Sequence, residues 1–141
     1  MDFKSILLIL FLAIISSFSF FISTEHTNEP IKYEAVKYEI VKYNFKSFEP
    51  NLQIMEKENN FWISICLGEK KSGGYEVKVN SIKRENDKLI IEISSKQNSK
   101  YVTQEFSYPS LTISIPKLDI KVVEVYIYED KIPLIITKDI E

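Results

Sequence analysis

Apolar and polar side chains alternate with a period of two through most of the chain after residue 60. This period is typical of strands that bury one face, and it recurs between obvious turn residues. Residues 61–67 and 75–79 each place apolar side chains at every second position. We therefore expect these two segments to form an antiparallel hairpin, connected by the loop 68–74.

A second hairpin is predicted directly after the first. Its turn is 84–88, because Asn86 and Asp87 tolerate left-handed backbone conformations, and its return strand is 89–93. The polar segment 94–100 is expected to be a loop. Further strands are predicted at residues 101–106, 111–115, 120–128 and 133–137.

The pattern before residue 60 is less regular. Within residues 31–45 the apolar positions change phase near Ile40, which favours a strand with a bulge or break there, and a helix is the alternative. Residues 48–58 have Pro50 near their start and apolar residues inside. They are expected to form either about two helical turns or a long connection.

These elements define the expected fold class. About six to eight short strands and no long helix predict a mainly β domain, either an antiparallel β-sandwich or a small barrel. A chain of 141 residues suits one domain of ordinary size with a short appendage. Residues 31–141 are therefore expected to form a single β domain.

Residues 1–24 are predicted to be a separate hydrophobic helix. Residues 5–24 carry no charged side chain, and as a helix they would span about 30 Å, the thickness of the hydrocarbon layer of a membrane. Lys4 precedes them and Ser17-Phe18-Ser19 is a poor cleavage motif, so a signal peptide and an uncleaved membrane anchor both remain open. Residues 25–30 are expected to be a linker. Both alternatives predict an exported protein, secreted or membrane-anchored with its domain outside the cytoplasm.

Charge does not direct the chain to a particular class of partner. There are 18 basic and 20 acidic residues, and Arg84 is the only arginine. Because arginine supplies the bidentate contacts to phosphate and guanine, nucleic acid is not expected as a partner. The single cysteine and single histidine exclude a disulfide framework and a Cys/His zinc site.

The sequence offers no evident catalytic set, and we expect no enzyme activity. His26 lies in the linker, and Cys66 is predicted to be a small buried or half-buried thiol on a strand. Acidic residues alternate with lysines along the strands, which is typical of a solvated face with cross-strand ion pairs. No carboxylate pair is set apart as acid and base, and no metal ion or cofactor is expected.

All three glycines of the chain lie in one short segment, 68–75. Glycine permits positive φ and close approach of the backbone, so we expect a shaped loop between two strands, with Tyr75 at the base of the second. A purely structural connection is the alternative. The candidate residues for binding a partner are Gly68, Glu69, Lys70, Lys71, Ser72, Gly73, Gly74 and Tyr75.

Tyr108-Pro109 is a second feature of interest, because it lies between two predicted strands. A bond between an aromatic residue and proline has an increased chance of being cis, and proline interrupts a strand ladder, so this dipeptide is expected to shape a corner. A contact role for Tyr108 is secondary. Gln104, Tyr108 and Pro109 are the secondary candidates for the partner site.

Several short motifs occur in a recognisable order between residues 61 and 127. They are Ile63-Ser-Ile-Cys-Leu-Gly-Glu-Lys70, Ser72-Gly-Gly-Tyr75, Val102-Thr-Gln104, Tyr108-Pro109 and Ile115-Pro-Lys117. With these motifs, the core 60–128 resembles the PrcB C-terminal domain family, exported bacterial domains named after a non-catalytic subunit of a cell-surface protease complex. Lys71 and Ser72 stand where that family commonly has Pro and Thr. The resemblance implies an all-β accessory domain outside the cytoplasm, of a kind that in at least one case associates with a protease and does not itself cleave.

Three functions follow from these observations as hypotheses. The first is an exported, non-catalytic binding domain, a subunit or partner of a surface or secreted protease, that docks through the loop 68–75 and neighbouring loops. The second is a protease inhibitor, because the Gly-rich loop followed by an aromatic residue is similar to the wedge loop of chagasin-type inhibitors. The third is a structural envelope protein. A hydrolase of unrecognised type is the weakest alternative, since the single His and Cys are badly placed.

Overall fold

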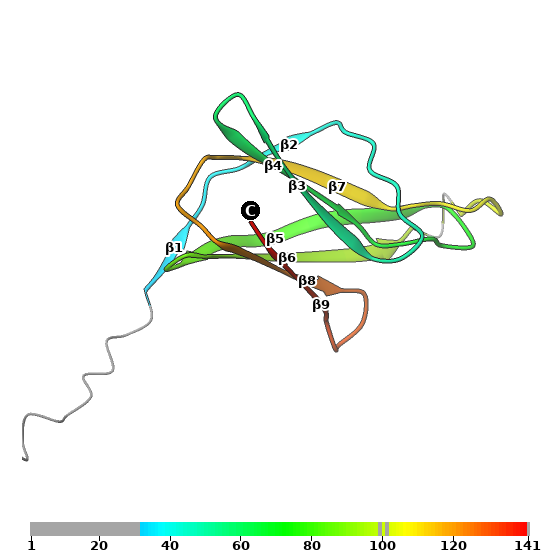
Figure 1. The fold of residues 1–141 in the computed structure, drawn as a ribbon. Coiled ribbons are helices and arrows are strands. Elements are labelled where there is room, and N and C mark those ends of the chain that lie inside the picture. Colours follow the sequence, from blue (N-terminus) through cyan, green and yellow to red (C-terminus); the bar gives the residue numbers. More distant parts are fainter. Residues whose placement is uncertain (1–31, 99, 101, 141) are drawn as a thin grey trace, which may run out of the picture. The chain divides into compact units, whose positions relative to one another are not determined.

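A computed structural model describes residues 32–98, 100 and 102–140 of the chain. Within these residues the chain forms nine strands and no helix, and the strands lie in two sheets (Figure 1). The strands are β1 (Tyr33–Ala35), β2 (Glu39–Val41), β3 (Asn51–Lys57), β4 (Asn60–Cys66), β5 (Tyr75–Glu85), β6 (Lys88–Gln97), β7 (Ser110–Pro116), β8 (Val122–Tyr128) and β9 (Leu134–Asp139).

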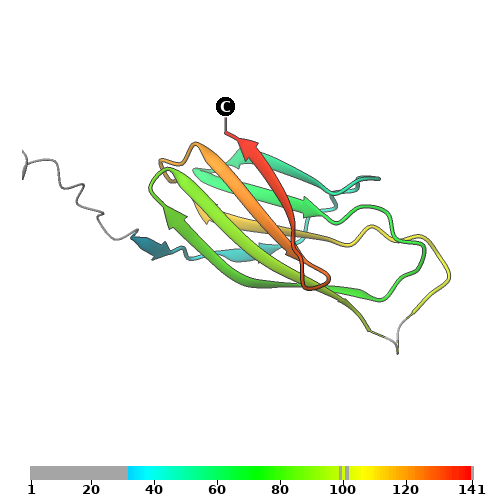
Figure 2. The same ribbon diagram turned by 90° about the horizontal axis from the view of Figure 1, so that it is seen from below.

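The two sheets form an open sandwich. The five-stranded sheet has the order β1-β5-β6-β8-β9, and the four-stranded sheet has the order β2-β7-β4-β3 (Figure 2). Neither sheet of the described residues closes on itself, so the sandwich is the correct one of the two expected architectures. The prediction of a mainly β domain is confirmed.

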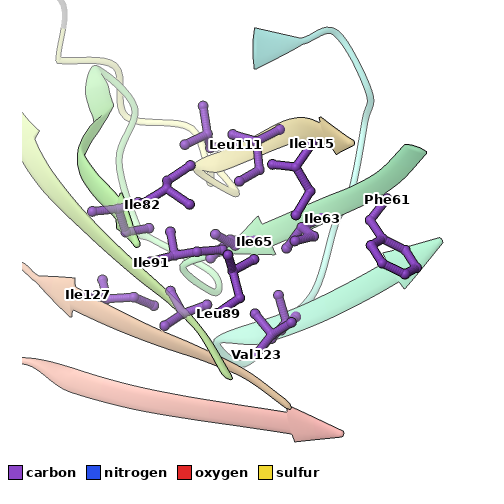
Figure 3. Close-up of a cluster of buried hydrophobic side chains, with 14 of the residues drawn as sticks. Phe61, Ile63, Ile65, Ile82, Leu89, Ile91, Leu111, Ile115, Val123 and Ile127 are labelled. Atoms are coloured by element: carbon purple, nitrogen blue, oxygen red, sulfur yellow. The ribbon is translucent and has the colours of Figure 1, made fainter. Parts of the chain in front are cut away.

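The core lies between the sheets and is formed by every second side chain of the central strands. Ile63 and Ile65 of β4 are fully buried, as are Leu89 and Ile91 of β6 (Figure 3). This burial explains the period of two, because successive side chains of a strand point to opposite faces. The core cluster comprises Leu52, Phe61, Ile63, Ile65, Leu67, Ile82, Leu89, Ile91, Ile93, Leu111, Ile113, Ile115, Ile120, Val123, Val125 and Ile127.

The hairpin expected around residues 84–88 is confirmed. β5 pairs with β6 from Tyr75↔Gln97 to Glu85↔Lys88, and Asn86 in the turn adopts a positive φ of 55°. The strands expected at 111–115, 120–128 and 133–137 correspond to β7, β8 and β9. Two neighbouring predictions were wrong: β6 extends through most of the expected loop 94–100, and the described residues of 101–106 form no strand.

The segment 48–58 contains a strand, not the helical turns or connection that the sequence favoured. β3 runs through it and pairs with β4 along its whole length, from Asn51↔Cys66 to Lys57↔Asn60. The turn between them is Glu58-Asn59, whose φ angles of 51° and 63° are both positive. Positive φ at both central residues is typical of a two-residue hairpin turn. The Asn-rich run 58–60 was therefore a turn signal that the sequence interpretation missed.

The hairpin expected between residues 61–67 and 75–79 does not exist. β4 lies in the four-stranded sheet and β5 in the five-stranded sheet, so the connecting segment crosses from one sheet to the other. The prediction of a purely antiparallel arrangement was also wrong, because β6 and β8 pair in parallel. Between β6 and β8 the chain crosses to the four-stranded sheet and forms β7. It then returns to the five-stranded sheet, where β8 runs in the same direction as β6.

The expected break near Ile40 is present, although it lies just before that residue. β1 pairs with β5 and β2 pairs with β7, so the break moves the chain from one sheet to the other. The following segment 42–50 contacts the four-stranded sheet, since the Cys66 thiol lies 3.6 Å from the Ser47 carbonyl oxygen and the Tyr43 and Trp62 rings meet edge to face. No helix replaces these strands in the described part of the segment.

Some predictions concern residues outside the described part of the chain. These are the signal peptide or anchor at 1–24, the linker at 25–30 and the position of His26. Among the residues that the structure does describe, none lies in a helix of the length and apolar character that crossing a membrane requires. Cys66 lies in the described part and is a fully buried free thiol, as expected.

Candidate functional site

Three connecting segments meet at one end of the sandwich. They are the sheet-to-sheet crossing that carries the three glycines, the segment that leads into β3, and the segment that leads into β7 (Figure 1). We call these segments, residues 46–50, 67–75 and 102–109, the loop end. It contains all the residues that the sequence singled out for partner binding.

Backbone hydrogen bonds join the glycine-rich crossing to the segment before β7. Lys70 and Ser107 form a two-way bridge, with N···O distances of 2.8 and 2.9 Å. The Gly73 amide donates to the Thr103 carbonyl oxygen at 3.0 Å, and the Leu67 amide donates to the Pro109 carbonyl oxygen at 2.9 Å. The crossing is therefore held along most of its length, although it belongs to no regular strand.

The segment before β3 holds the other side of the crossing at Gly68. The Glu69 amide donates to the Phe48 carbonyl oxygen at 2.9 Å. Gly68 has a φ of 89°, and a Cβ atom there would lie 3.0 Å from the Pro50 Cδ and 3.1 Å from the Phe48 oxygen. A left-handed backbone conformation in contact with another backbone segment is a position that glycine fills without strain.

Gly73 is required for a different reason, which is close packing. A Cβ atom on this residue would lie 2.3 Å from the Thr103 Oγ1. The side chain of Thr103 therefore occupies the space that any larger residue at 73 would need. The expectation of a loop shaped by its glycines agrees with this geometry, but the contact residue Thr103 was not predicted.

Two side chains from outside the crossing fix Ser72 and Gly73. The Gln97 Nε2 donates to the Ser72 Oγ at 2.9 Å and to the Gly73 carbonyl oxygen at 3.1 Å. The Ser107 hydroxyl donates to the Ser72 carbonyl oxygen at 2.6 Å. Neither Gln97 nor Ser107 was predicted, because each lies far from the crossing in the sequence and only the register of β5 against β6 brings Gln97 to Tyr75.

Tyr108 connects all three segments of the loop end. Its hydroxyl donates to the Glu69 carboxylate at 2.6 Å, and this hydrogen bond is the main cause of a raised pKa of the Tyr108 phenol. The Phe48 ring packs edge to face against it at 5.9 Å, and the Lys46 ammonium lies 4.1 Å from its ring centre. Tyr108 thus remains a neutral hydrogen-bond donor, and its ring supports an exposed aromatic neighbour.

Lys70 ties the crossing to the turn after β8. Its ammonium group lies 2.7 Å from the Glu129 carboxylate and 5.7 Å from the centre of the Tyr75 ring. An ion pair of this exposure contributes little to stability, typically below about 1 kcal/mol. Its main effect is to fix the direction of the Lys70 side chain, which leaves Lys71 as the exposed lysine of the crossing.

Apolar side chains protrude from this hydrogen-bonded framework. Phe48 is 74% exposed, Phe106 is 63% exposed and Val102 is 42% exposed. Single exposed apolar residues are common on protein surfaces, but here they protrude from segments whose backbones are bonded to one another. Phe48 and Phe106 were not predicted as site residues. The available signal was an aromatic residue flanked on both sides by polar residues, which holds for Phe48 and for Phe106.

The secondary candidates lie within the same region. Gln104 is exposed, and Pro109 leads directly into β7, with a trans Tyr108–Pro109 peptide bond. Within the described residues no group of three or more His, Cys, Asp or Glu side chains is arranged to hold a metal ion. The loop end exposes the aromatic rings of Phe48 and Phe106 together with the charged residues Lys71 and Glu69 on hydrogen-bonded backbone segments.

The fold and this surface define a two-sheet β domain with a structured loop end. Residues 62–116 match the family model described as PrcB C-terminal. The match extends from β4 to β7 and includes the whole glycine-rich crossing, and it confirms the expected resemblance to that family over these residues. Comparisons with curated proteins and with solved structures gave no match.

Proposed function

We propose that this chain is a non-catalytic binding domain that docks a partner protein through the loop end. The observation that carries the proposal is the exposure of Phe48 and Phe106 on segments that are fixed by backbone hydrogen bonds. A surface that is already ordered loses little conformational entropy on binding, so its apolar contacts contribute more of their energy to affinity. Large aromatic residues are also the most frequent anchors of protein interfaces.

A protease is the partner that we propose, and export is part of the same proposal. The support for a protease is the match of residues 62–116 to the PrcB C-terminal model, whose name refers to a protease complex subunit. The support for export is the uncharged, apolar segment 5–24. A domain at the cell surface, secreted or anchored there, would meet such a partner outside the cytoplasm.

Inhibition of a protease by loop insertion is the second function we carry, and the geometry favours it less. Insertion needs the Gly73–Gly74 pair to enter the partner's active site, whereas Gly73 is buried under Thr103. Docking of the outer side chains needs no such rearrangement. A structural role in the envelope remains the third alternative, and a test of partner capture separates it from the other two.

The proposal is tested by capturing envelope and medium proteins with the full chain as bait. We expect the double variant Phe48→Ser, Phe106→Ser to lose the partner, because it removes the two exposed rings. The matched control is Tyr33→Ser, which removes a 55% exposed ring on β1, at the opposite end of the sandwich. Equal capture by the wild type and the double variant would contradict docking through the loop end. If adding the pure chain to a protease slows cleavage of a model substrate, the result would instead support inhibition.

A further inference from the structure

The edge of β5 between Tyr75 and Val79 has no strand beside it in the described structure. β1 pairs with β5 only at its far end, from Ala35↔Lys83 to Tyr33↔Glu85, and the Val36 amide adds one bond to the Ile82 carbonyl oxygen at 3.1 Å. A strand edge with free amides and carbonyls is a template for pairing with another strand. Within the described residues, the first half of β5 is such an edge.

The free backbone groups of this edge can be assigned to residues. The Asn98 amide donates to the Gly74 carbonyl oxygen at 2.8 Å, so Gly74 points toward β6. In an antiparallel pair the residues alternate between pointing toward the partner strand and away from it. The amides and carbonyls of Tyr75, Val77 and Val79 therefore point away from β6, toward the free edge of the sheet, and we call these three the outward residues. Beyond Val79 a register shift before Ser81 interrupts the alternation and ends the regular edge.

The opposite side of the sandwich is protected in a way that this edge is not. There β3 and β9 are the edge strands, and the Lys138 ammonium donates to the Leu52 carbonyl oxygen of β3 at 3.0 Å. A lysine that caps an outward carbonyl hinders the addition of another strand. The described contacts of Tyr75, Val77 and Val79 include no such cap.

We propose that a second copy of this chain pairs antiparallel with this edge, about a two-fold axis through Val77. An isologous interface requires a surface that is complementary to itself. With Val77 facing its own copy, Tyr75 faces Val79 of the partner, so all three outward residues of each strand meet outward residues of the other. Each of their amides then finds a carbonyl, and the two five-stranded sheets become continuous.

The charges of β5 select this register over its neighbours. On the exposed face, Glu76 faces Lys78 of the second copy, and Lys78 faces its Glu76, which gives two cross-strand ion pairs. A slip by two residues in one direction would place Glu76 opposite Glu76, and a slip in the other direction would place Lys78 opposite Lys78. Within its own chain Glu76 faces Lys96 and accepts a hydrogen bond from the Asn98 side chain, whereas Lys78 faces Ser94 and has no carboxylate opposite it. The ion pair with the second copy therefore supplies the opposite charge that Lys78 lacks.

The same pattern argues for a copy of this chain over an unrelated peptide. An unrelated peptide would need one acidic and one basic residue two positions apart, in the register that faces Lys78 and Glu76. A second copy of β5 carries this pair. This surface lies along a strand of the five-stranded sheet and does not require the exposed rings of Phe48 and Phe106. The inference therefore goes beyond the proposed partner docking and stands or falls separately from it.

Charge reversal tests the pairing. The full chain, kept soluble in a mild, density-matched detergent, is examined by sedimentation velocity over a wide range of concentration. We expect a concentration-dependent dimer for the wild type. For Glu76→Lys alone and for Lys78→Glu alone we expect the affinity of self-association to fall by roughly tenfold or more relative to the wild type. Lys131→Glu, in the exposed turn after β8, is the control for net charge and is expected to behave as the wild type.

Two experiments in which dimerisation is restored distinguish strand pairing from a general effect of net charge. The double variant Glu76→Lys, Lys78→Glu restores complementarity and is expected to dimerise again. A mixture of the two single variants is expected to form a heterodimer, because one chain then carries lysine at both positions and faces a chain that carries glutamate at both. Equal thermal unfolding midpoints show that the variants fold. A monomeric wild type, or single variants that dimerise as the wild type does, would overturn the proposal.

Discussion

The side chain of Thr103 occupies the space beside Gly73 where a Cβ atom would otherwise lie, with its Oγ1 2.3 Å from that position. The two residues also share a backbone hydrogen bond, from the Gly73 amide to the Thr103 carbonyl oxygen. Because the bond fixes the two backbones at this separation, the contact cannot be relieved by moving the segments apart without breaking it. A side chain at 73 therefore requires the Thr103 side chain to rotate or the two segments to separate.

Gly73→Ala is expected to destabilise the domain by about 1 kcal/mol, because Thr103 must leave its preferred rotamer or the hydrogen bond must lengthen. Thr103→Ala removes the colliding oxygen, so the double variant Gly73→Ala, Thr103→Ala is expected to recover most of that loss. Urea unfolding of the four proteins measures this coupling. Additive effects of the two substitutions would show that the residues do not share the space.

The buried hydroxyls of Ser64 and Thr112 predict a second coupling. They lie 2.8 Å apart and are almost completely enclosed. Ser64→Ala leaves the Thr112 hydroxyl without its partner and is expected to cost about 1–3 kcal/mol of unfolding free energy. Adding Thr112→Val removes the orphaned hydroxyl at nearly constant shape and is expected to restore stability close to the wild-type value. If the double variant were less stable than Ser64→Ala, the hydroxyl pair would not be the cause.

The response to acid is expected to depend on Glu124. The Tyr126 hydroxyl donates to this carboxylate, and the Lys88 ammonium lies 3.4 Å from it, so the pKa of Glu124 falls below its ordinary value of 4.5. The same hydrogen bond raises the pKa of Tyr126 to about 12. A carboxylate with a lowered folded-state pKa contributes stability that is complete above pH 4.5 and is lost as the pH falls through the folded value.

Tyr126→Phe removes the hydrogen bond and is expected to make stability less dependent on pH below 4.5. The measurement compares unfolding free energies of the wild type and the variant at neutral pH and in the acid range. The wild type should lose more stability than the variant over that interval. An identical acid-induced loss in both proteins would exclude the hydrogen bond from Tyr126 to Glu124 as its cause.

The order of the loop end is open to measurement by amide hydrogen exchange. The amides of Lys70, Gly73 and Ser107 all donate to backbone carbonyls outside any named strand. We expect these three amides to exchange much more slowly than in an unfolded chain, because each must break a hydrogen bond before it can exchange. Exchange at the rate of an unstructured peptide would contradict the preordered surface on which the proposed function depends.

The sequence predicted the class of the fold well, because the class depends on local alternation. The turn at Asn86 and the inward positions of β6 follow from neighbouring residues alone, and both are confirmed. The alternation does not say to which sheet a strand belongs. For this reason β4 and β5, close in sequence and similarly patterned, were wrongly joined as a hairpin. β3 was missed because the Glu58-Asn59 turn carries no glycine or proline.

The candidate site was predictable only in part for the same reason. The concentration of glycines marked residues 68–75, and Gly68 and Gly73 do have structural requirements that glycine meets. Their contacts with Pro50 and Thr103 join segments that are distant in the sequence. Phe48 became part of the site because β3 begins beside the crossing, which the interpretation of 48–58 as helix or connection could not reveal. Local patterns locate a loop, and the strand order determines what surrounds it.

Site-specific photo-crosslinking in the producing cells tests the central claim most directly. A photoreactive phenylalanine analogue replaces Phe106 in one full-length variant and Tyr33 in another, since both positions are more than half exposed and lie at opposite ends of the sandwich. We predict a covalent adduct with a second protein, a protease, from position 106 and not from position 33. The same adduct from both positions, or none from position 106, would contradict docking through the loop end.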